Sequence, residues 1–452
     1  MTATLAAPLA PRTTLADPDL SHLPGPPRRP VVGHTLDCLR DSYGFSLANR
    51  ARYGNVYRID LVGRPRVMLH GTDAAALVFE DRERIFSSRE GWNNVEDLFP
   101  DCLLTQDFDE HRHHRRIMTA AFKAPVMRNY LAAMAPEIEG LVAQLPVGHR
   151  FAFHPKVKEL LLRLGASLLM GLEPNDARIG PLNRAFIAEV EAAYGIVRRP
   201  LPFTKMGRAV KGRAYLTDTF RALIAERRAA PGDDFFSQMC VASDEDGKGW
   251  SEREIVDHFN FLMAAVYDTT ATTLSSMVDG LARNPEWQDR VREEVSAVEG
   301  AVDDDALRSM VLTEQVFKEA LRLVPPVPFV PRRAMRAFTF EGVRVPAGAL
   351  VSIDPGLVMR DPALWTDPDR FDPDRFSPAR AEDRGHKYAW APFGGGAHKC
   401  LGMHFAVMQA KLFVREILRG HRVEWVRPRT RWQMAPIPRP ADGLPVRLIP
   451  MG

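Results

Sequence analysis

The sequence is poor in cysteine, with only Cys38, Cys102, Cys240 and Cys400 in 452 residues. Four scattered cysteines are too few for the disulfide framework of a small secreted protein, and they form no cluster that could hold an iron–sulfur centre. No run approaches the roughly 18–20 apolar residues that a membrane-spanning helix needs. Residues 1–22 lack the basic start and apolar core of a secretory signal. We therefore expect a cytoplasmic protein without a membrane span.

Neither positive nor negative charge is in large excess. Sixty Lys and Arg residues against 57 Asp and Glu residues give a formal net charge of +3, which does not indicate a nucleic-acid-binding protein. Hydrophobic residues make up 45% and charged residues 26%, as in ordinary globular proteins, so disordered and collagen-like classes are excluded. No repeat or linker divides the chain. We expect one large domain over residues 23–452, behind a flexible N-terminal tail over residues 1–22.

Helical patterns dominate the chain. Apolar residues at three- and four-residue spacing predict helices over residues 158–172, 209–228, 252–284, 313–323 and 402–419. Alternating apolar residues predict two short strands within residues 56–71, around a turn at Gly63-Arg64-Pro65, and further strand within residues 338–351. The predicted fold is mainly α, with a small β part drawn from both ends of the chain.

A glycine-rich segment that ends in a cysteine is the sharpest local signal. It starts at Phe393, contains glycines at 394–396 and 402, and places Cys400 just before a predicted helix. Backbone amides and the positive end of the helix dipole both stabilise a thiolate over a thiol at such a position. The glycines let the backbone approach a large flat group, whereas a phosphate loop is excluded because no Lys-Ser/Thr follows them. The alternative is a buried structural cysteine in a glycine-rich turn.

Three further segments carry polar residues at positions that bear on function. Glu319 and Arg322 are three residues apart, which lets them pair on one helix face, as many solvated helix pairs also do. Arg375 lies in a proline-locked segment. Asp268 and Thr269 interrupt an apolar helix, where both are poor helix formers that compete for backbone hydrogen bonds. A role for this polar cluster is favoured over chance.

In order and spacing, these segments resemble the cytochrome P450 family over essentially the whole chain. The family pattern FGxGxHxCxG is matched at Phe393, Gly394, Gly396, His398, Cys400 and Gly402. The ExxR pattern matches Glu319 and Arg322, the Pro-x-Arg-Phe pattern matches Arg375, and the acid–alcohol pair matches Asp268 and Thr269.

The resemblance implies a haem b cofactor (iron protoporphyrin IX) with Cys400 as the axial ligand of the iron. A thiolate ligand donates electron density that favours O–O bond cleavage, and Phe393 would pack beside the ring and the sulfur and tune this effect. The implied partners of the haem propionates are His111, Arg115, His398 and Arg332, with Arg333 left open as an alternative to Arg332. A solvated basic face is the alternative for residues 111–116. Gly402 and Ala265 complete the implied cofactor-binding set.

The resemblance also implies roles for the other polar residues. A buried ion-pair core that holds the cysteine loop in position would consist of Glu319, Arg322 and Arg375. Asp268 and Thr269 would be the catalytic pair that relays protons to dioxygen. The family usually has glycine or alanine where this chain has Val266, and we expect this β-branched residue to narrow the oxygen-binding groove of the helix.

A separate electron donor is also implied, because the chain has no dinucleotide-binding fingerprint and no cysteine cluster. The expected partner is a ferredoxin or a flavoprotein reductase that docks on a basic face. The residues expected on that face are Arg112, Arg116, Lys399, Lys411 and Arg415. Scattered surface charge without a docking role is the alternative.

The implied substrate pocket is apolar and aromatic, which suits a lipophilic ligand. Its expected residues are Phe99, Leu103, Phe261, Ala264, Val327, Phe329 and Val330, and ordinary core packing is the alternative for each. Residues 199–213 are similar to the branch that contains retinoid-, sterol- and terpenoid-oxidising members. We therefore expect an isoprenoid, sterol-like or fatty acid-like substrate.

The leading functional prediction is a monooxygenase that inserts one atom of O2 into a C–H bond. A peroxide-driven peroxygenase is a second hypothesis, against which the acid–alcohol pair argues. A haem-thiolate binding or sensing protein without enzymatic activity is a third.

Overall fold

The computed structural model describes residues 15–451, except residues 30, 174, 194, 196, 244–246, 248 and 427–429. Its α-helices are α1 (Thr35–Tyr53), α2 (Thr72–Glu80), α3 (Ser88–Gly91), α4 (Asn93–Glu96), α5 (Phe108–Thr119), α6 (Ala124–Val142), α7 (Phe153–Met170), α8 (Ile179–Ala193), α9 (Lys205–Ala229), α10 (Phe235–Val241), α11 (Glu252–Arg283), α12 (Pro285–Ser296), α13 (Asp304–Ser309), α14 (Val311–Leu323), α15 (Pro355–Val358) and α16 (Met403–Gly420). Short 3-10 turns are η1 (Leu103–Thr105), η2 (Ala120–Phe122), η3 (Pro373–Phe376), η4 (Glu382–Arg384) and η5 (Gly396–His398). The strands are β1 (Val56–Leu61), β2 (Arg64–Leu69), β3 (Phe86–Ser87), β4 (Arg150–Ala152), β5 (Val330–Ala334), β6 (Phe338–Phe340), β7 (Val343–Val345), β8 (Leu350–Ile353), β9 (His421–Trp425), β10 (Trp432–Gln433), β11 (Arg439–Pro440) and β12 (Pro445–Pro450).

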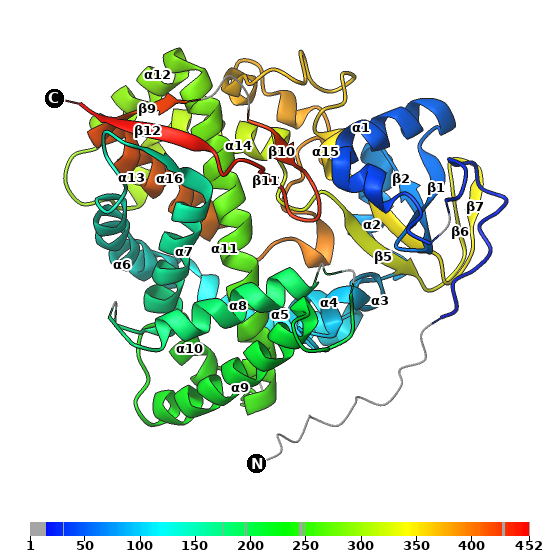
Figure 1. The fold of residues 1–452 in the computed structure, drawn as a ribbon, viewed down its shortest axis with the longest axis horizontal. Coiled ribbons are helices and arrows are strands. Elements are labelled where there is room, and N and C mark those ends of the chain that lie inside the picture. Colours follow the sequence, from blue (N-terminus) through cyan, green and yellow to red (C-terminus); the bar gives the residue numbers. More distant parts are fainter. Residues whose placement is uncertain are drawn as a thin grey trace.

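Helix α11 is the central element of the helical part (Figure 1). It begins at a capping box, in which Ser251 accepts from the Glu254 amide at 3.2 Å and the Glu254 carboxylate accepts from the Ser251 amide at 2.8 Å. It ends at Asn284, because the following Pro285 disfavours helical geometry in the residue before it. Helices α7, α8, α9, α14 and α16 all contact α11, so the predicted helix over residues 252–284 organises the apolar core.

The main sheet of the β part lies beside this helical body, on the right in Figure 1. It has the order β1-β2-β8-β5-β3, in which only the β2–β8 pair is parallel. A second sheet joins β12 of the C-terminal segment to β4 and β9. The prediction of a mainly α fold, with a small β part drawn from distant parts of the chain, is therefore confirmed.

The turn between the first two strands differs from the prediction. Arg64 and Pro65 belong to β2 and pair with Leu61 and Asp60 of β1, so the turn is Val62-Gly63. Both turn residues have positive φ, +51° and +75°. Proline cannot adopt positive φ, and a two-residue hairpin turn of this kind needs it at both central positions, which moves the turn one step toward the N-terminus.

The helical body and the main sheet each have an apolar core. The larger fills the helical body, and the smaller lies on one face of the main sheet, against α2. The predicted tail over residues 1–22 lies outside the described residues up to position 14; within the described portion, Leu20 is 3% exposed and packs in the smaller core. None of the described helices has an apolar stretch long enough to cross a membrane.

Candidate active site around Cys400

Cys400 lies between η5 and the first turn of α16, at the end of the glycine-rich loop. Its amide donates to the Phe393 carbonyl at 2.9 Å, which closes the loop on itself. Gly396 has φ +60°, and a Cβ there would lie 1.7 Å from the Phe79 carbonyl oxygen. Only glycine fits at this contact with α2, which is a close approach to protein backbone; the predicted approach of the glycines to a large flat group stays a prediction.

The Cys400 side chain is exposed, yet burial by the surrounding protein raises the pKa of its thiol. The residue is therefore accessible although protein surrounds most of its thiol. The amide of Gly402 and the guanidinium of Arg115 act in the opposite direction and lower that pKa. The amide and charge stabilisation predicted for the thiolate is present, but in the protein alone desolvation outweighs it.

Two histidines from distant segments stack beside the cysteine loop. The rings of His111 on α5 and His398 in η5 lie 3.8 Å apart. Burial lowers the pKa of His111 to about 4 and also lowers that of His398, so both imidazoles are neutral at pH 7. The Nε2 atom of His111 is buried and has no hydrogen-bond partner among the described residues.

Two arginines complete this cluster. Arg115 donates to the Lys399 carbonyl at 2.6 Å, and Arg332 donates to its own neighbour, the Pro331 carbonyl, at 2.8 Å. Neither has an ion pair with a carboxylate among the described residues, and burial lowers the pKa of Arg332 to about 10. Arg333 points elsewhere, because it pairs with Asp17 at 3.1 Å. The cluster thus presents a buried cation, Arg332, a half-buried cation, Arg115, and a buried imidazole nitrogen, none of which has a carboxylate partner among the described residues.

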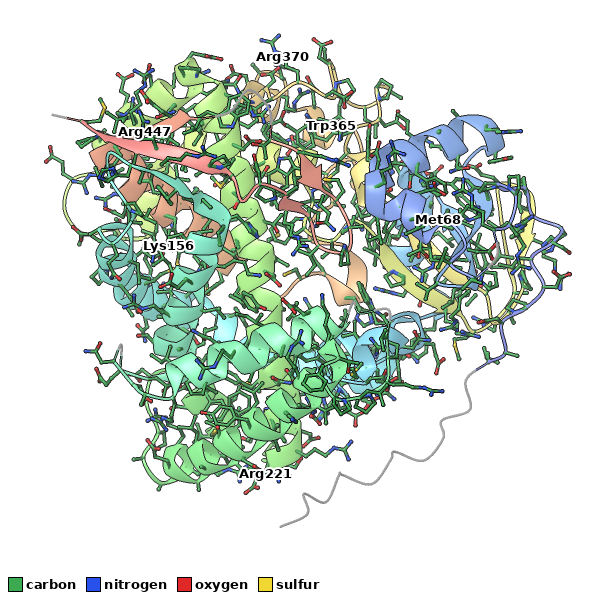
Figure 2. All side chains as sticks on the ribbon, viewed as in Figure 1. Met68, Lys156, Arg221, Trp365, Arg370 and Arg447 are labelled. Atoms are coloured by element: carbon green, nitrogen blue, oxygen red, sulfur yellow. The ribbon has the colours of Figure 1, made fainter. Side chains whose placement is uncertain are left out.

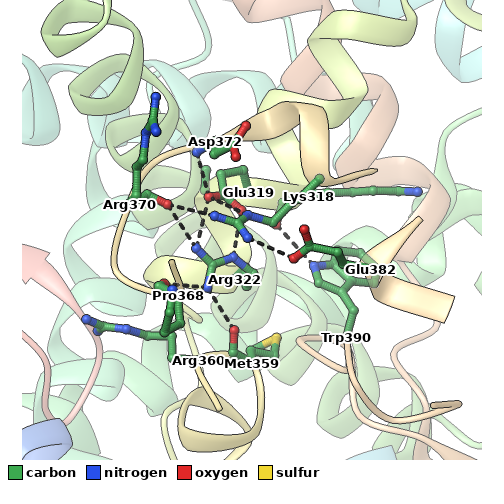
Figure 3. A network of polar contacts seen from close by, with 12 residues as sticks. Lys318, Glu319, Arg322, Met359, Arg360, Pro368, Arg370, Asp372, Glu382 and Trp390 are labelled. Atoms are coloured by element: carbon green, nitrogen blue, oxygen red, sulfur yellow. Dashed lines mark hydrogen bonds and ion pairs between the residues drawn. The ribbon is translucent and has the colours of Figure 1, made fainter. Parts of the chain in front are cut away.

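The ion-pair core of Glu319, Arg322 and Arg375 is fully buried (Figure 3). Glu319 accepts from Arg322 at 2.6 and 2.9 Å and from Arg375 at 3.2 Å. Its carboxylate also accepts from the Asp372 amide at 2.8 Å. One acid therefore serves two guanidinium groups and one backbone amide.

Arg375 also pairs with a second acid, Glu382, at 3.0 Å, and the remaining guanidinium donors of this core bind backbone carbonyls. Arg322 donates to the carbonyls of Met359, Pro368 and Arg370, and Arg375 donates to those of Thr366, Asp367 and Arg370. These contacts fix the path of the segment that precedes the cysteine loop.

Trp390 links the ion-pair core to the cysteine loop. Its indole Nε1 donates to the Lys318 carbonyl at 3.1 Å, and Figure 3 shows it beside Glu382. Phe393 packs edge-on against Trp390 and stacks on Phe317 of α14, with centroid separations of 6.0 and 6.2 Å. The sequence did not single out Trp390, although an aromatic residue three positions before Phe393 was a possible signal.

Asp268 and Thr269 are adjacent in α11, where the sequence predicted a helix, and Asp268 has an additional partner. Thr269 donates its hydroxyl proton to the Ala265 carbonyl at 2.7 Å, so its oxygen remains free to accept. Asp268 forms an ion pair with Lys158 of α7, whose ammonium also lies 5.1 Å from the Tyr267 ring centroid. Sequence reasoning missed Lys158, which lies in the charged first turns of α7 between Lys156 and Glu159. Val266 is half-buried and packs against the large core.

The predicted pocket residues divide among three apolar clusters. Phe99 and Phe261 pack edge to face at 5.9 Å. The large core also contains Leu103, Ala264 and Val327. Phe329 instead packs with Tyr57, Ile59 and Met68 on one face of the main sheet, and Val330 packs with the core on the opposite face. Five of the seven residues therefore share one apolar core.

The prediction of a basic docking face is wrong for two of its five residues, which are buried. Lys411 and Arg415 are 3% and 4% exposed, because α16 is buried on almost all sides. Lys411 pairs with Glu314 at 2.6 Å, and Arg415 pairs with Glu416 and donates to the Val298 carbonyl at 3.0 Å. Arg112, Arg116 and Lys399 are exposed, and Arg112 pairs with Asp109 at 3.2 Å.

The family model described as Cytochrome P450 matches residues 23–437. The chain belongs to the cytochrome P450 family. It is 35% identical over 452 residues to the protein named Putative cytochrome P450 136 of Mycobacterium tuberculosis, with 97% of this chain and 92% of that one covered. It is 27% identical over 446 residues to Cytochrome P450 26B1 of Homo sapiens, with 92% and 85% covered. The solved structure of "Retinoic acid bound cyanobacterial CYP120A1" superposes with a TM-score of 0.86 at 28% identity, covering 95% of this chain and all of that chain.

Members of the cytochrome P450 family are haem-thiolate monooxygenases that use dioxygen, so this chain is an oxidoreductase of that class, acting on lipophilic substrates. The cluster around Cys400 fits the cofactor. Haem carries two carboxylates, and Arg115, Arg332 and the free Nε2 atom of His111 supply cations and a hydrogen-bonding atom without a carboxylate partner among the described residues.

Proposed function

We propose that this cytochrome P450 inserts one atom of dioxygen into a C–H bond of an isoprenoid, sterol-like or fatty acid-like molecule, with Cys400 as the axial haem ligand. The position of Cys400 carries the proposal: it ends the glycine-rich loop next to Arg115, and neither Arg115 nor Arg332 has a paired acid among the described residues. Haem held by a thiolate supplies the chemistry that activates dioxygen. All other steps fall to side chains of this chain.

In this proposal, the propionate carboxylates bind to Arg115, Arg332, His111 and His398. The two guanidinium groups neutralise the carboxylates, and the imidazoles form hydrogen bonds with them. A buried carboxylate without such partners would be strongly destabilised. Arg332 is assigned in preference to Arg333, because Arg333 pairs with Asp17. Ala265, Phe393 and Gly402 would complete the residues that hold the haem.

Thr269 and Asp268 form the proposed proton path. The Thr269 hydroxyl donates to Ala265, which leaves its oxygen lone pairs to accept a proton or a water molecule. In this scheme, Asp268 passes protons on to Thr269 when its carboxylate is released from the ion pair with Lys158. Lys158 is a positioning residue in this scheme, because it holds the carboxylate without touching the substrate.

Two observations support a lipophilic substrate of the proposed classes. The predicted pocket residues on α11 and in the segment from residue 98 to residue 104 are apolar or aromatic and meet in one core. The CYP120A1 protein, which has the same fold at 28% identity, is described as bound to retinoic acid, an isoprenoid acid. We extend that class of ligand to this chain.

We also propose that a separate ferredoxin or flavoprotein reductase supplies the electrons. Exposed Arg112, Arg116 and Lys399 lie on α5 and the cysteine loop, close to the proposed haem ligand. They would attract an acidic partner in a salt-sensitive manner. A cytoplasmic location is proposed as well, and it is supported by four cysteines that are all free thiols.

The test is an absorption spectrum of the purified protein, first ferric and then reduced under carbon monoxide. A strongly red-shifted Soret band would support thiolate ligation by Cys400. A band typical of histidine ligation, or no haem, would refute the proposal. Rapid turnover with peroxide alone, and slow turnover with a reductase, would point to the peroxygenase hypothesis instead.

A further inference from the structure

The segment between α3 and α5 carries two of the predicted pocket residues but little regular structure. Between α4 and η1, residues 97–102 belong to no helix or strand. Side chains hold this backbone in place. The Thr105 hydroxyl donates to the Phe99 carbonyl at 3.2 Å, and the Arg213 guanidinium donates to the Leu98 carbonyl at 2.6 Å. The peptide groups on both sides of Phe99 are thus fixed.

Arg213 reaches this segment from α9, a helix at the edge of the helical body. Other cations of α9 are exposed, among them Lys211 and Arg221, which is labelled in Figure 2. The Arg213 side chain is only 21% exposed. A guanidinium that is withdrawn from water is destabilised unless its donors find acceptors. The acceptors that Arg213 finds therefore explain why it points inward.

The second acceptor of Arg213 belongs to α11. The guanidinium pairs with Asp257, whose side chain is 4% exposed. Asp257 precedes Phe261 by four residues, about one turn of α11, so the two side chains lie on the same side of this helix. Phe261 meets Phe99 edge to face at 5.9 Å. One guanidinium therefore joins the backbone beside Phe99 to the helix one turn before Phe261.

Phe261 also belongs to the accessible side of α11. Phe261, Ala265 and Thr269 are each partly exposed and follow one another at four-residue spacing. Residues 263–264 and 267–268, which lie between them, are buried. Ala265 and Thr269 are part of the proposed haem site and proton path. A substrate that approaches Thr269 along this side of α11 therefore contacts the Phe261 ring.

Arg253 shows which contact of Arg213 is distinctive. Arg253 also pairs with Asp257, at 3.5 Å, and with Asp101 at 2.6 Å, but its side chain is 59% exposed. Asp257 therefore keeps a cation when Arg213 is removed, whereas the Leu98 carbonyl loses the donor at 2.6 Å. The bond to Leu98 separates the two arginines, and it is the bond that acts on the segment of Phe99.

We propose that Arg213 is a positioning residue of the substrate pocket, which holds Phe99 against Phe261 and thereby fixes the aromatic ring on the accessible side of α11. This inference rests on the proposed function and deepens it, because it names a residue that selects among lipophilic substrates. Arg213 itself does not touch the substrate. A flat apolar group of the substrate packs on the fixed Phe261 ring, and it loses this contact when the ring is free to turn.

The test compares imidazole with 4-phenylimidazole in optical titrations of the ferric holoenzyme. Both ligands bind through the same type of ring nitrogen, so the added phenyl group reports on the aromatic ring beside it. We expect the wild-type protein to bind 4-phenylimidazole about tenfold to a hundredfold more tightly than imidazole, as burial of a phenyl group provides. Arg213→Met should reduce this preference about twofold to tenfold, the range for loss of one aromatic contact, and change imidazole affinity by less than about twofold.

Arg253→Met is the matched control, since it removes another cation from Asp257 and leaves the Leu98 contact in place. It should keep the wild-type preference. Phe99→Leu should lower the preference as Arg213→Met does, and the two changes together should lower it no further, because they break the same link. Arg213→Met combined with Asp257→Asn removes the buried charge that the single variant leaves behind. It should have a higher Tm than Arg213→Met and the same low preference.

Wild-type protein without a preference for 4-phenylimidazole would overturn this role of Arg213, and that result does not depend on the folding of any variant. An unchanged preference in Arg213→Met, equal losses for the two ligands, the same loss in Arg253→Met, or additive effects of Arg213→Met and Phe99→Leu would also overturn it. Where Arg213→Met cannot be purified, its combination with Asp257→Asn serves for the same comparisons. Absence of the red-shifted carbon monoxide band in wild-type protein refutes the proposed function, whereas its presence beside any of these outcomes refutes the role of Arg213 alone.

Discussion

Replacement of Glu319 with alanine removes the only acid that serves Arg322 and Arg375 together among the described residues. All three side chains are fully buried. The substitution deletes four hydrogen bonds, two from Arg322, one from Arg375 and one from the Asp372 amide. It leaves Arg322 without an acid among the described residues and Arg375 with Glu382 alone, and the two buried guanidinium groups then repel each other.

The expected cost follows from that geometry. Loss of one partner from a buried ion pair destabilises a protein by about 3–5 kcal/mol. Typical domains are stable by only about 5–15 kcal/mol, so much of the margin is lost. Because the Arg322 and Arg375 contacts also fix the segment before the cysteine loop, we expect Glu319→Ala to be insoluble or free of haem. The assay is soluble yield, haem per protein from the carbon monoxide band, and the urea midpoint of any purified protein.

Two variants sharpen this experiment. Arg290→Ala removes a two-point ion pair with Asp374 at 3.1 Å, but both side chains are more than 40% exposed, so the cost is about 0–1 kcal/mol. It should retain normal haem content. Glu319→Gln keeps the shape and removes the charge, and we expect it to resemble Glu319→Ala. Normal haem content and an unchanged urea midpoint in either Glu319 variant would refute the reasoning.

Four other outcomes are expected. Cys400→His should lose the red-shifted carbon monoxide band and oxygenase activity while it retains some haem, which absorption spectra and product assays would show. Thr269→Ala should consume reductant and release peroxide in place of product, and a product-to-reductant ratio equal to that of the wild type would argue against the relay. Lys158→Met deprives the Asp268 carboxylate of its partner, and we expect a lower kcat with little change in KM and a shifted pH profile; an unchanged profile would exclude a positioning role. Burial raises the pKa of Glu189 from 4.5 to about 8, so the folded state keeps a proton that the unfolded chain loses and stability falls as pH rises through this range. Glu189→Gln should therefore flatten the dependence of Tm on pH between 5 and 8.5, and a parallel pair of Tm curves would contradict this assignment.

The local motifs were predictable from the sequence because their partners lie within a few residues or belong to a fixed pattern. The pairing of Glu319 with Arg322 follows from their three-residue spacing on one helix. The glycines before Cys400 predicted an approach of the backbone to a large flat group, and the structure shows that Gly396 also meets the Phe79 carbonyl of α2. The identity of the neighbour, Phe79, could not be inferred, because it depends on how α2 docks against the loop.

The wrong and the missed residues also depend on contacts between elements that are distant in the sequence. Lys411 and Arg415 were expected at the surface from their charge, but they lie on a helix whose other positions are nearly all apolar, and such a helix is buried on several sides. Their acidic partners then have to come from elsewhere, as Glu314 does for Lys411. Lys158 was missed because its partner, Asp268, lies on another helix. Contacts between distant elements are set by tertiary packing, which hydrophobic periodicity does not report.

The segment between residues 359 and 370 is held by its own backbone. Arg322 and Arg375 donate hydrogen bonds to its backbone carbonyl oxygens. Among the described residues 361–370, only Trp365 has a buried side chain. Carbonyl oxygens are the same for every amino acid, so the path of the chain does not depend on most of the side chains along it. Substitution of the segment's exposed side chains should therefore leave the cysteine loop in place. For the same reason, exposed positions such as Asp369 and Arg370 offer places to attach a fluorophore or an affinity handle that leaves the catalytic centre undisturbed.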